Sequence, residues 1–178
     1  VAYRPDEKAS DIKEIGAFIG DKIKSFDKEY QKDLKIVIEP GKYLVSEAGF
    51  FLAEVSQKKD VYGSTFVYVN AGFNHFIRPM YYDAYHHITN ISRKSKLKET
   101  VNVVGFLCEN DTFAHQRELS KTEVGDILCF HNAGAYSYTM SSSYNMRERP
   151  AEVLIEGKNV KITQKRQVFK DLVAGQNI

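Results

Sequence analysis

The sequence predicts a mainly β protein: a C-terminal β-barrel or β-sandwich domain, preceded by one helix and one strand of an α/β unit. Three observations support this fold class. From residue 43 onward, apolar and polar residues alternate with period two in short runs that Gly, Asn and Asp separate. Tyr and Phe are abundant, at 11 each, which suits a β-rich core. The first forty residues instead show helical periodicity followed by one apolar run.

The N-terminal segment predicts a helix and then a buried strand. Asp11 and Glu14 have the spacing of a capping box, and apolar residues then recur on one helical face, so we expect a helix over residues 11–26. The apolar, β-branched run 34–38 leads into a Pro-Gly turn, as expected of a buried strand. Helix followed by strand is the repeating unit of an α/β barrel or doubly wound sheet, and one unit cannot stand alone. We therefore expect it to end a domain that begins upstream of residue 1.

The remainder of the chain predicts short strands connected by turns. We divide the sequence into a remnant of an α/β barrel, residues 1–42, and a β domain, residues 43–178. A short helical turn is expected near residues 169–173. The predicted strands are 43–55, 65–69, 101–107, 125–130, 151–155 and 160–164.

Composition and charge favour a protein that binds neither nucleic acid nor membrane. The net charge is +2, and the densest basic stretch, residues 93–98, has no aromatic residue interleaved with it, so we interpret it as a solvated loop. No apolar run is long enough to span a bilayer. Cys108 and Cys129 are too few for a disulfide framework, so we expect a reducing compartment and a cytoplasmic protein.

Two motifs contain residues suited to an anion or a heterocycle. Glu39 to Lys42 follow the predicted strand 34–38, where α/β barrels gather functional side chains, and a carboxylate there could hold a proton on a heterocyclic nitrogen. An acidic residue entering a common turn is the alternative. Arg78 could bind a carboxylate through the planar fork of its guanidinium, and Tyr82 could donate its hydroxyl to the same group. An edge strand whose tyrosine hydroxyls point into solvent would have the same composition.

The adjacent histidines His86 and His87 do not predict a metal site. Neighbouring residues on a strand point to opposite faces, so the two imidazoles cannot easily share one ion.

Two further motifs follow predicted strands. Cys108 beside Glu109 could be a proton donor or nucleophile, although a lone Cys at a strand end is more often buried packing. The small residues 132–135 would let backbone approach a ligand closely and let Tyr136 reach a phosphate, unless they form only a tight turn. The serine-rich stretch 141–150 is interpreted as a polar loop.

In their order and spacing, these motifs resemble the fold type III pyridoxal-phosphate-dependent decarboxylases, the alanine-racemase-like group that includes ornithine decarboxylases. Within that group they are most similar to the diaminopimelate decarboxylases. The resemblance implies that residues 1 to about 40 end a barrel that binds pyridoxal 5'-phosphate, with the phosphate loop and the Schiff-base lysine upstream. The chain alone is then expected to be inactive. The motifs are Glu39-Pro40-Gly41-Lys42, Arg78-Pro79 with Tyr82, Cys108-Glu109, Asn132-Ala133-Gly134-Ala135-Tyr136 and Arg149-Pro150-Ala151-Glu152-Val153.

The resemblance also implies three cofactor contacts. Glu39 matches the carboxylate that contacts the pyridine nitrogen, and Tyr136 matches the tyrosine that closes over the cofactor. Lys42 stands where the family usually has Arg, near both phosphate and substrate; it keeps the charge but loses the bidentate fork.

The implied substrate contacts come from two segments. Arg78 and Tyr82 match residues that bind a substrate carboxylate, together with Lys42. Glu109 matches the acid that binds the distal amino group of diaminopimelate, and Cys108 matches the residue that returns a proton to the α-carbon.

The resemblance implies a homodimer with shared active sites, in which Cys108 and Glu109 of one subunit complete the site of the other. The expected reaction of the full-length protein is decarboxylation of meso-diaminopimelate to L-lysine. A decarboxylase of ornithine, arginine or a siderophore precursor, or a non-catalytic homologue, stays open. The family often reads Cys-Glu-Ser-Gly-Asp where this chain has Cys108-Glu109-Asn110-Asp111.

Overall fold

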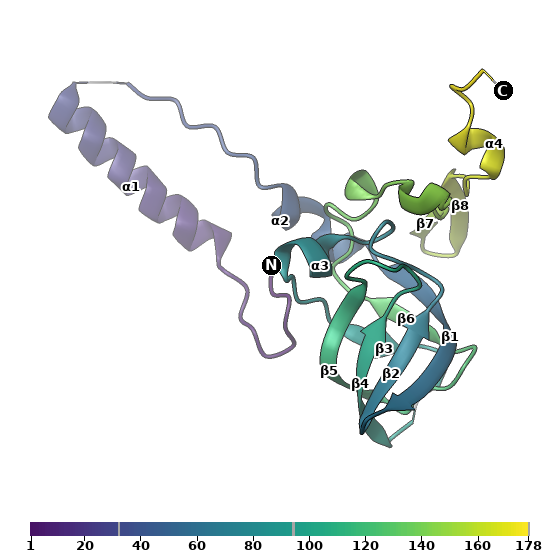
Figure 1. Ribbon diagram of the computed structural model, residues 1–178. Coiled ribbons are helices and arrows are strands. Elements are labelled where there is room, and N and C mark those ends of the chain that lie inside the picture. Colours follow the sequence, from purple (N-terminus) through teal and green to yellow (C-terminus); the bar gives the residue numbers. More distant parts are fainter. Residues whose placement is uncertain (32, 94, 178) are drawn as a thin grey trace.

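The computed structural model describes residues 1–31, 33–93 and 95–177. Its centre is a six-stranded sheet that nearly closes into a barrel, with a helical arm and a two-stranded hairpin projecting from it (Figure 1). The mainly β fold class is therefore confirmed. The strands of the sheet are β1 (Phe51–Val61), β2 (Ser64–Val69), β3 (Ile88–Asn90), β4 (Lys98–Val104), β5 (Thr112–Ser120) and β6 (Ile127–Phe130).

The strand order is β3-β6-β1-β2-β4-β5. Strands β2 and β4 run parallel, whereas the other neighbours are antiparallel. The two ends of the order, β3 and β5, contact each other. Arg117 of β5 reinforces this approach, because its Nη1 donates a 2.7 Å hydrogen bond to the carbonyl oxygen of His86, just before β3. Closure leaves little strand edge exposed to other chains.

Aromatic rings fill the interior of the barrel. The ring centroids of Phe51 and Phe76 lie 5.2 Å apart, as do those of Phe113 and Phe130. Such tilted pairs are favourable arrangements for aromatic rings. Fully buried valines from β1, β2 and β4 pack around them: Val55, Val67, Val69, Val101 and Val103.

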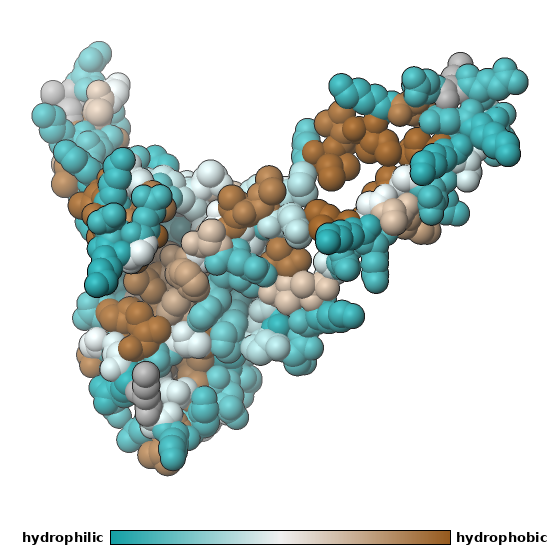
Figure 2. All heavy atoms as spheres, turned by 180° about the vertical axis from the view of Figure 1, so that it is seen from behind, coloured by the Kyte–Doolittle hydropathy of each residue, from teal (hydrophilic) through white to brown (hydrophobic). Residues whose placement is uncertain are grey.

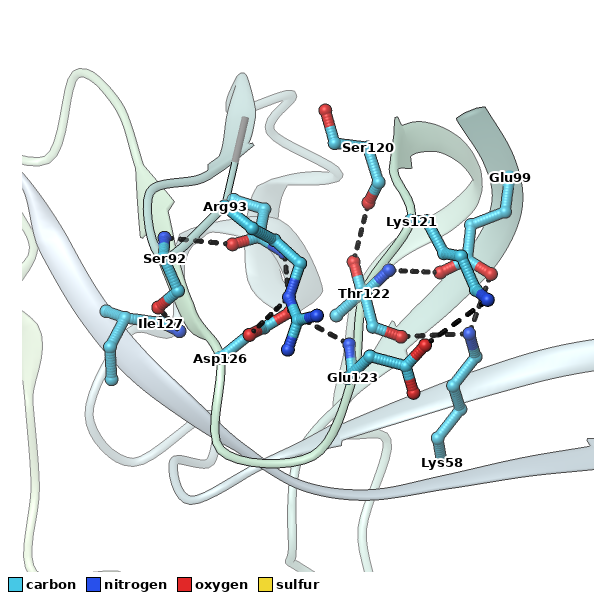
Figure 3. A network of polar contacts seen from close by, with 11 residues as sticks. Lys58, Ser92, Arg93, Glu99, Ser120, Lys121, Thr122, Glu123, Asp126 and Ile127 are labelled. Atoms are coloured by element: carbon cyan, nitrogen blue, oxygen red, sulfur yellow. Dashed lines mark hydrogen bonds and ion pairs between the residues drawn. The ribbon is translucent and has the colours of Figure 1, made fainter. Parts of the chain in front are cut away.

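A polar network fastens the turn between β5 and β6 (Figure 3). The buried carboxylate of Asp126 accepts hydrogen bonds from Asn90 Nδ2 at 2.8 Å, Arg93 Nε at 2.8 Å and the backbone N–H of Glu123 at 2.9 Å. Burial by itself raises the pKa of Asp126, but these hydrogen bonds outweigh it and lower the pKa below the usual value.

The helical arm is α1 (Ile12–Tyr30), four residues longer at its C-terminal end than the predicted helix 11–26. Asp11 caps it, accepting a 2.8 Å hydrogen bond from the backbone N–H of Lys13. The apolar face is not covered: Phe18 is 64% exposed, and hydrophobic residues gather on this arm in Figure 2. Within the described ranges, no helix has the length and apolar character needed to cross a bilayer.

The predicted strand 34–38 is not formed within the part of the chain that the structure describes. Residues 33–40 form extended chain without strand pairing, and Val37 is 77% exposed. A buried parallel strand exists only where neighbouring strands accept its hydrogen bonds, and the described chain supplies none here. The division at residue 42 stays a prediction.

The predicted strand 43–55 is partly wrong. Residues 41–48 form α2 (Gly41–Val45) and the 3₁₀ turn η1 (Ser46–Ala48), and the strand begins at Phe51. The β-branched and aromatic composition favoured a strand, but close packing against residues 133 and 134 decides the conformation.

Three further elements, one helix and two strands, differ from the sequence predictions. The possible edge strand at Arg78 is the short helix α3 (Arg78–Tyr82), which has a proline in its first turn. Strands β3 and β5 had no predicted counterpart.

The C-terminal predictions are confirmed. Strands β7 (Glu152–Glu156) and β8 (Asn159–Gln164) pair as an antiparallel hairpin, and α4 (Phe169–Leu172) follows. The 3₁₀ turns η2 (Tyr138–Met140) and η3 (Tyr144–Met146) precede them. Every residue of both hairpin strands is exposed.

Candidate functional site

A pocket of about 410 Å³ brings together four of the predicted site residues. Its lining consists of Lys42, Arg78, Tyr82, Ala84 and Tyr136. They come from three segments far apart in sequence: the start of α2, the helix α3 with the residues after it, and the loop after β6.

Helix α3 places Arg78 and Tyr82 together. Residues four apart lie on the same helical face, so both side chains reach the pocket. The helix ends at Asp83, which adopts the left-handed conformation with φ 50°. The rings of Tyr3 and Tyr82 each lie with their centroid 5.7 Å from the guanidinium carbon of Arg78, within cation–π range.

Close backbone packing sets the position of Tyr136. Its hydroxyl lies 2.5 Å from where a Cβ on Gly41 would be, so a larger residue at position 41 would displace the tyrosine side chain. Tyr136 itself has φ +59°, a strained value for a bulky residue. Neighbouring backbone fixes the loop, because the N–H of Gly134 donates to the carbonyl oxygen of Ser46 at 3.0 Å. A side chain on Gly134 would collide with the carbonyl oxygen of Val45.

The charge of the pocket suits an anion. Lys42 and Arg78 are cationic, Tyr82 and Tyr136 supply hydroxyls, and none of the five lining residues is acidic. Arg78 is only 7% exposed, and no carboxylate of the described residues forms an ion pair with it. A buried guanidinium without an acidic partner is costly, so the arrangement favours a bound carboxylate or phosphate.

Cys108 and Glu109 are not part of this lining. They lie exposed on the loop between β4 and β5, which Asp111 anchors. The Asp111 carboxylate accepts hydrogen bonds from the N–H of Leu107 at 2.7 Å and of Phe73 at 2.5 Å. Burial raises the pKa of Asp111, although these two hydrogen bonds oppose the shift.

Tyr144 contacts Glu109, and this contact was not predicted from the sequence. Its hydroxyl donates a 2.8 Å hydrogen bond to Glu109 Oε1, and that bond raises the pKa of Tyr144. The next residue, Asn145, brings Nδ2 to 3.9 Å from Cys108 Sγ and has φ 55°. Asn tolerates this conformation better than most residues. In the sequence, these two contacts of the Cys108-Glu109 pair show only as a tyrosine and an asparagine within a polar loop.

Glu39 also lies outside the pocket lining. It is exposed at the end of the extended segment 33–40. The described residues also include no group of three or more His, Cys, Asp or Glu side chains arranged to hold a metal ion.

A family model for the C-terminal sheet domain of pyridoxal-dependent decarboxylases matches residues 42–134. The chain belongs to this family. The match contains Lys42, Arg78, Tyr82 and the Cys108-Glu109 pair, while Tyr136 lies just beyond it. The sheet β1–β6 falls within the matched range.

Individual decarboxylases resemble the whole chain. The diaminopimelate decarboxylase of Methanothermobacter thermautotrophicus is 40% identical over 100% of this chain and 42% of that protein. The one from Aquifex aeolicus is 40% identical over 94% of the chain and 44% of that protein. The chain thus spans less than half the length of these relatives.

Solved structures give the same relationship. The crystal structure of diaminopimelate decarboxylase from M. jannaschii has a TM-score of 0.87 and 35% identity, over 100% of this chain and 41% of that one. The co-complex of the M. jannaschii enzyme with L-lysine has a TM-score of 0.89 and 36% identity, over 99% of this chain and 40% of that one.

Proposed function

We propose that this chain is the C-terminal part of an enzyme that decarboxylates meso-diaminopimelate to L-lysine with pyridoxal 5'-phosphate. The observation that carries the proposal is the buried Arg78 guanidinium, which faces a pocket without acidic residues. The 40% identity to diaminopimelate decarboxylases and the solved complex of one of them with L-lysine support the same substrate class.

The residues present fit the cofactor. Lys42 and Tyr136 offer an ammonium and a hydroxyl to a phosphate group, and both line the pocket. Glu39 is the proposed carboxylate partner of the pyridine nitrogen. When bound, the cofactor supplies the electron sink that stabilises the carbanion left by loss of CO2.

The chain's own residues bind the substrate and return a proton. Arg78 and Tyr82, with Lys42 beside them, bind the carboxylate that the substrate retains. Glu109, oriented by Tyr144, binds the distal ammonium. The Cys108 thiol donates a proton to the carbon that has lost CO2.

We further propose that Cys108 and Glu109 act in the pocket of a second subunit. Their position outside the lining of the chain's own pocket supports an isologous homodimer with two shared sites. Two free thiols, one of them exposed, support a reducing, cytoplasmic setting.

The test of the activity uses the full-length protein with pyridoxal 5'-phosphate. We expect visible absorbance from bound cofactor and release of CO2 from meso-diaminopimelate, but not from ornithine or arginine. Bound cofactor with release from ornithine or arginine alone would replace the substrate and keep the family chemistry. No bound cofactor and no release would favour a non-catalytic homologue.

The test of the shared site mixes two inactive variants. In a heterodimer of Arg78→Ala and Cys108→Ala subunits, one site receives an intact pocket and an intact loop. Random mixing makes half of the dimers heterodimers, so about 25% of wild-type activity should return. The matched control mixes Cys108→Ala with Glu109→Gln, whose lesions lie on the same loop and cannot complement. No recovery in the first mixture would place both residues in the site of one subunit.

A further inference from the structure

The buried Arg78 guanidinium is held by a histidine that the proposed function does not use. Arg78 Nε donates a hydrogen bond to His86 Nε2 at 3.3 Å. His86 is only 1% exposed, and its Nδ1 lies 2.8 Å from the carbonyl oxygen of His131. The contacts form one chain, from the backbone after β6 through the imidazole to the guanidinium.

Both contacts require one protonation state of His86. A carbonyl oxygen only accepts, so Nδ1 carries the hydrogen, and an Arg N–H only donates, so Nε2 carries the free electron pair. Burial, together with the positive charges of Arg78 and Arg117, lowers the pKa of His86 to about 4, although the hydrogen bond to the carbonyl oxygen of His131 opposes the shift. Near neutral pH the imidazole is therefore neutral and in the tautomer that Arg78 needs.

This hydrogen bond also restricts how Arg78 meets a ligand. A guanidinium can bind a carboxylate through Nε and one Nη, or through both Nη atoms. His86 occupies Nε, so the pair of Nη atoms remains. The rings of Tyr3 and Tyr82 flank the group at 5.7 Å and limit its rotation.

We propose that His86 is a positioning residue: a neutral imidazole that occupies Arg78 Nε and aims the two Nη atoms at the substrate carboxylate. The proposal rests on the function given above, in which Arg78 binds the carboxylate that is not removed. In this proposal His86 acts through Arg78 on the recognition of that carboxylate and does not touch the reacting atoms.

Packing alone would be the ordinary role for such a histidine. Its ring meets Phe76 edge-on at 4.6 Å and Tyr3 edge-on at 5.3 Å. Loss of packing would lower stability and weaken all ligands alike, whereas loss of positioning would weaken only ligands that carry the carboxylate.

L-lysine and cadaverine separate the two roles, because cadaverine is the same diamine chain without the carboxylate. We would measure the dissociation constants of both for the full-length protein with pyridoxal 5'-phosphate. His86→Phe keeps a ring of similar size but has no acceptor. The control is His87→Phe, at the neighbouring half-buried position, whose ring lies tilted against that of His131 with the centroids 5.2 Å apart.

We expect the wild type to prefer L-lysine, and His86→Phe to reduce that preference about tenfold, because a hydrogen bond to a charged group is lost. His87→Phe should leave the preference within twofold. His86→Gln, whose Oε1 can accept from Arg78 Nε, should restore part of it, and His86→Leu, which also lacks an acceptor, serves if the phenylalanine variant does not fold. An unchanged preference in the acceptor-free variant relative to His87→Phe, accompanied only by lower stability, would overturn the positioning role, as would a preference in His86→Gln no higher than in the acceptor-free variant. No preference in the wild type would instead refute the carboxylate site at Arg78, and the proposed function with it.

Discussion

Asp111 anchors the loop that presents Cys108 and Glu109, and its replacement by alanine should destabilise the sheet domain measurably. The carboxylate is 6% exposed and accepts the backbone N–H groups of Leu107 and Phe73. Each buried donor left without an acceptor costs about 1–3 kcal/mol, so two should cost about 2–4 kcal/mol once the partly exposed Leu107 amide regains water. Urea unfolding followed by circular dichroism measures the loss.

Two companion variants sharpen the measurement. Asp111→Asn keeps one acceptor oxygen and should lose roughly half as much, about 1–2 kcal/mol. Asn110→Ala is the control, because Asn110 is exposed and the described residues give it no side-chain hydrogen bond. A loss below about 1 kcal/mol for Asp111→Ala, or one equal to that of the control, would refute the anchoring argument.

The same residue predicts a pH dependence. Burial raises the pKa of Asp111 in the folded state above its unfolded value near 3.9, so protonation of this carboxyl stabilises the folded protein. This stabilisation is fully present below about pH 3.9 and is lost as the pH rises through the folded-state pKa. Asp111→Asn should lack this slope, so its deficit relative to the wild type should be largest at low pH. A deficit that grows as the pH rises through this window would contradict the raised pKa.

Three other perturbations test separate parts of the molecule. Gly134→Ala should cost about 2–3 kcal/mol by overpacking the loop, whereas Gly16→Ala, in open space on α1, should be neutral or stabilising in the same urea assay. Asp126 has a lowered pKa, so its contribution to folding stability is present above about pH 3.9 and is lost as the pH falls. Asp126→Asn should therefore be less stable than the wild type at neutral pH, and its stability should fall less steeply as the pH is lowered. Glu109→Gln should lower the Tyr144 pKa, read from its carbon-13 ring signal, and an unchanged value would exclude their hydrogen bond in solution.

The sequence predicts the strands that combine alternation with strong turn residues. Residues 65–69 lie within β2, and the last four residues of the predicted strand 125–130 form β6. Strand β5 escaped because its sequence, Thr-Phe-Ala-His-Gln-Arg-Glu-Leu-Ser, is polar over its middle, and pairing with β4 rather than composition holds it. Helix α3 is five residues long, too short for helical periodicity to emerge.

The candidate site was predictable only in part. Arg78 and Tyr82 lie four residues apart and are placed together by one helix, but Lys42 and Tyr136 join them only through the tertiary fold. Their motifs were located by resemblance, since no local pattern links positions 42 and 136. His86 gave no usable signal, because its role depends on a carbonyl oxygen 45 residues away.

Apolar patterning in this chain is satisfied in one region, where the apolar side chains are buried, and unsatisfied in three others, where they are exposed. Between β1 and β6 the predicted apolar residues form a closed aromatic and valine core. In α1, in residues 34–38 and in the β7–β8 hairpin, equally clear apolar patterns end in exposed side chains, such as Val37 and Ile155. Large exposed apolar surfaces are typical of sites that contact another domain or another protein. Under the proposed function a cofactor-binding barrel supplies those contacts, and the segment 33–40 then gains the strand partners that its sequence requires. Glu39 lies near the end of this segment, so the one proposed cofactor contact that is not in the pocket lining belongs to the part whose apolar side chains are exposed. The pocket residues Arg78 and Tyr82 belong to the part that is complete, which is why their geometry is already formed in this chain.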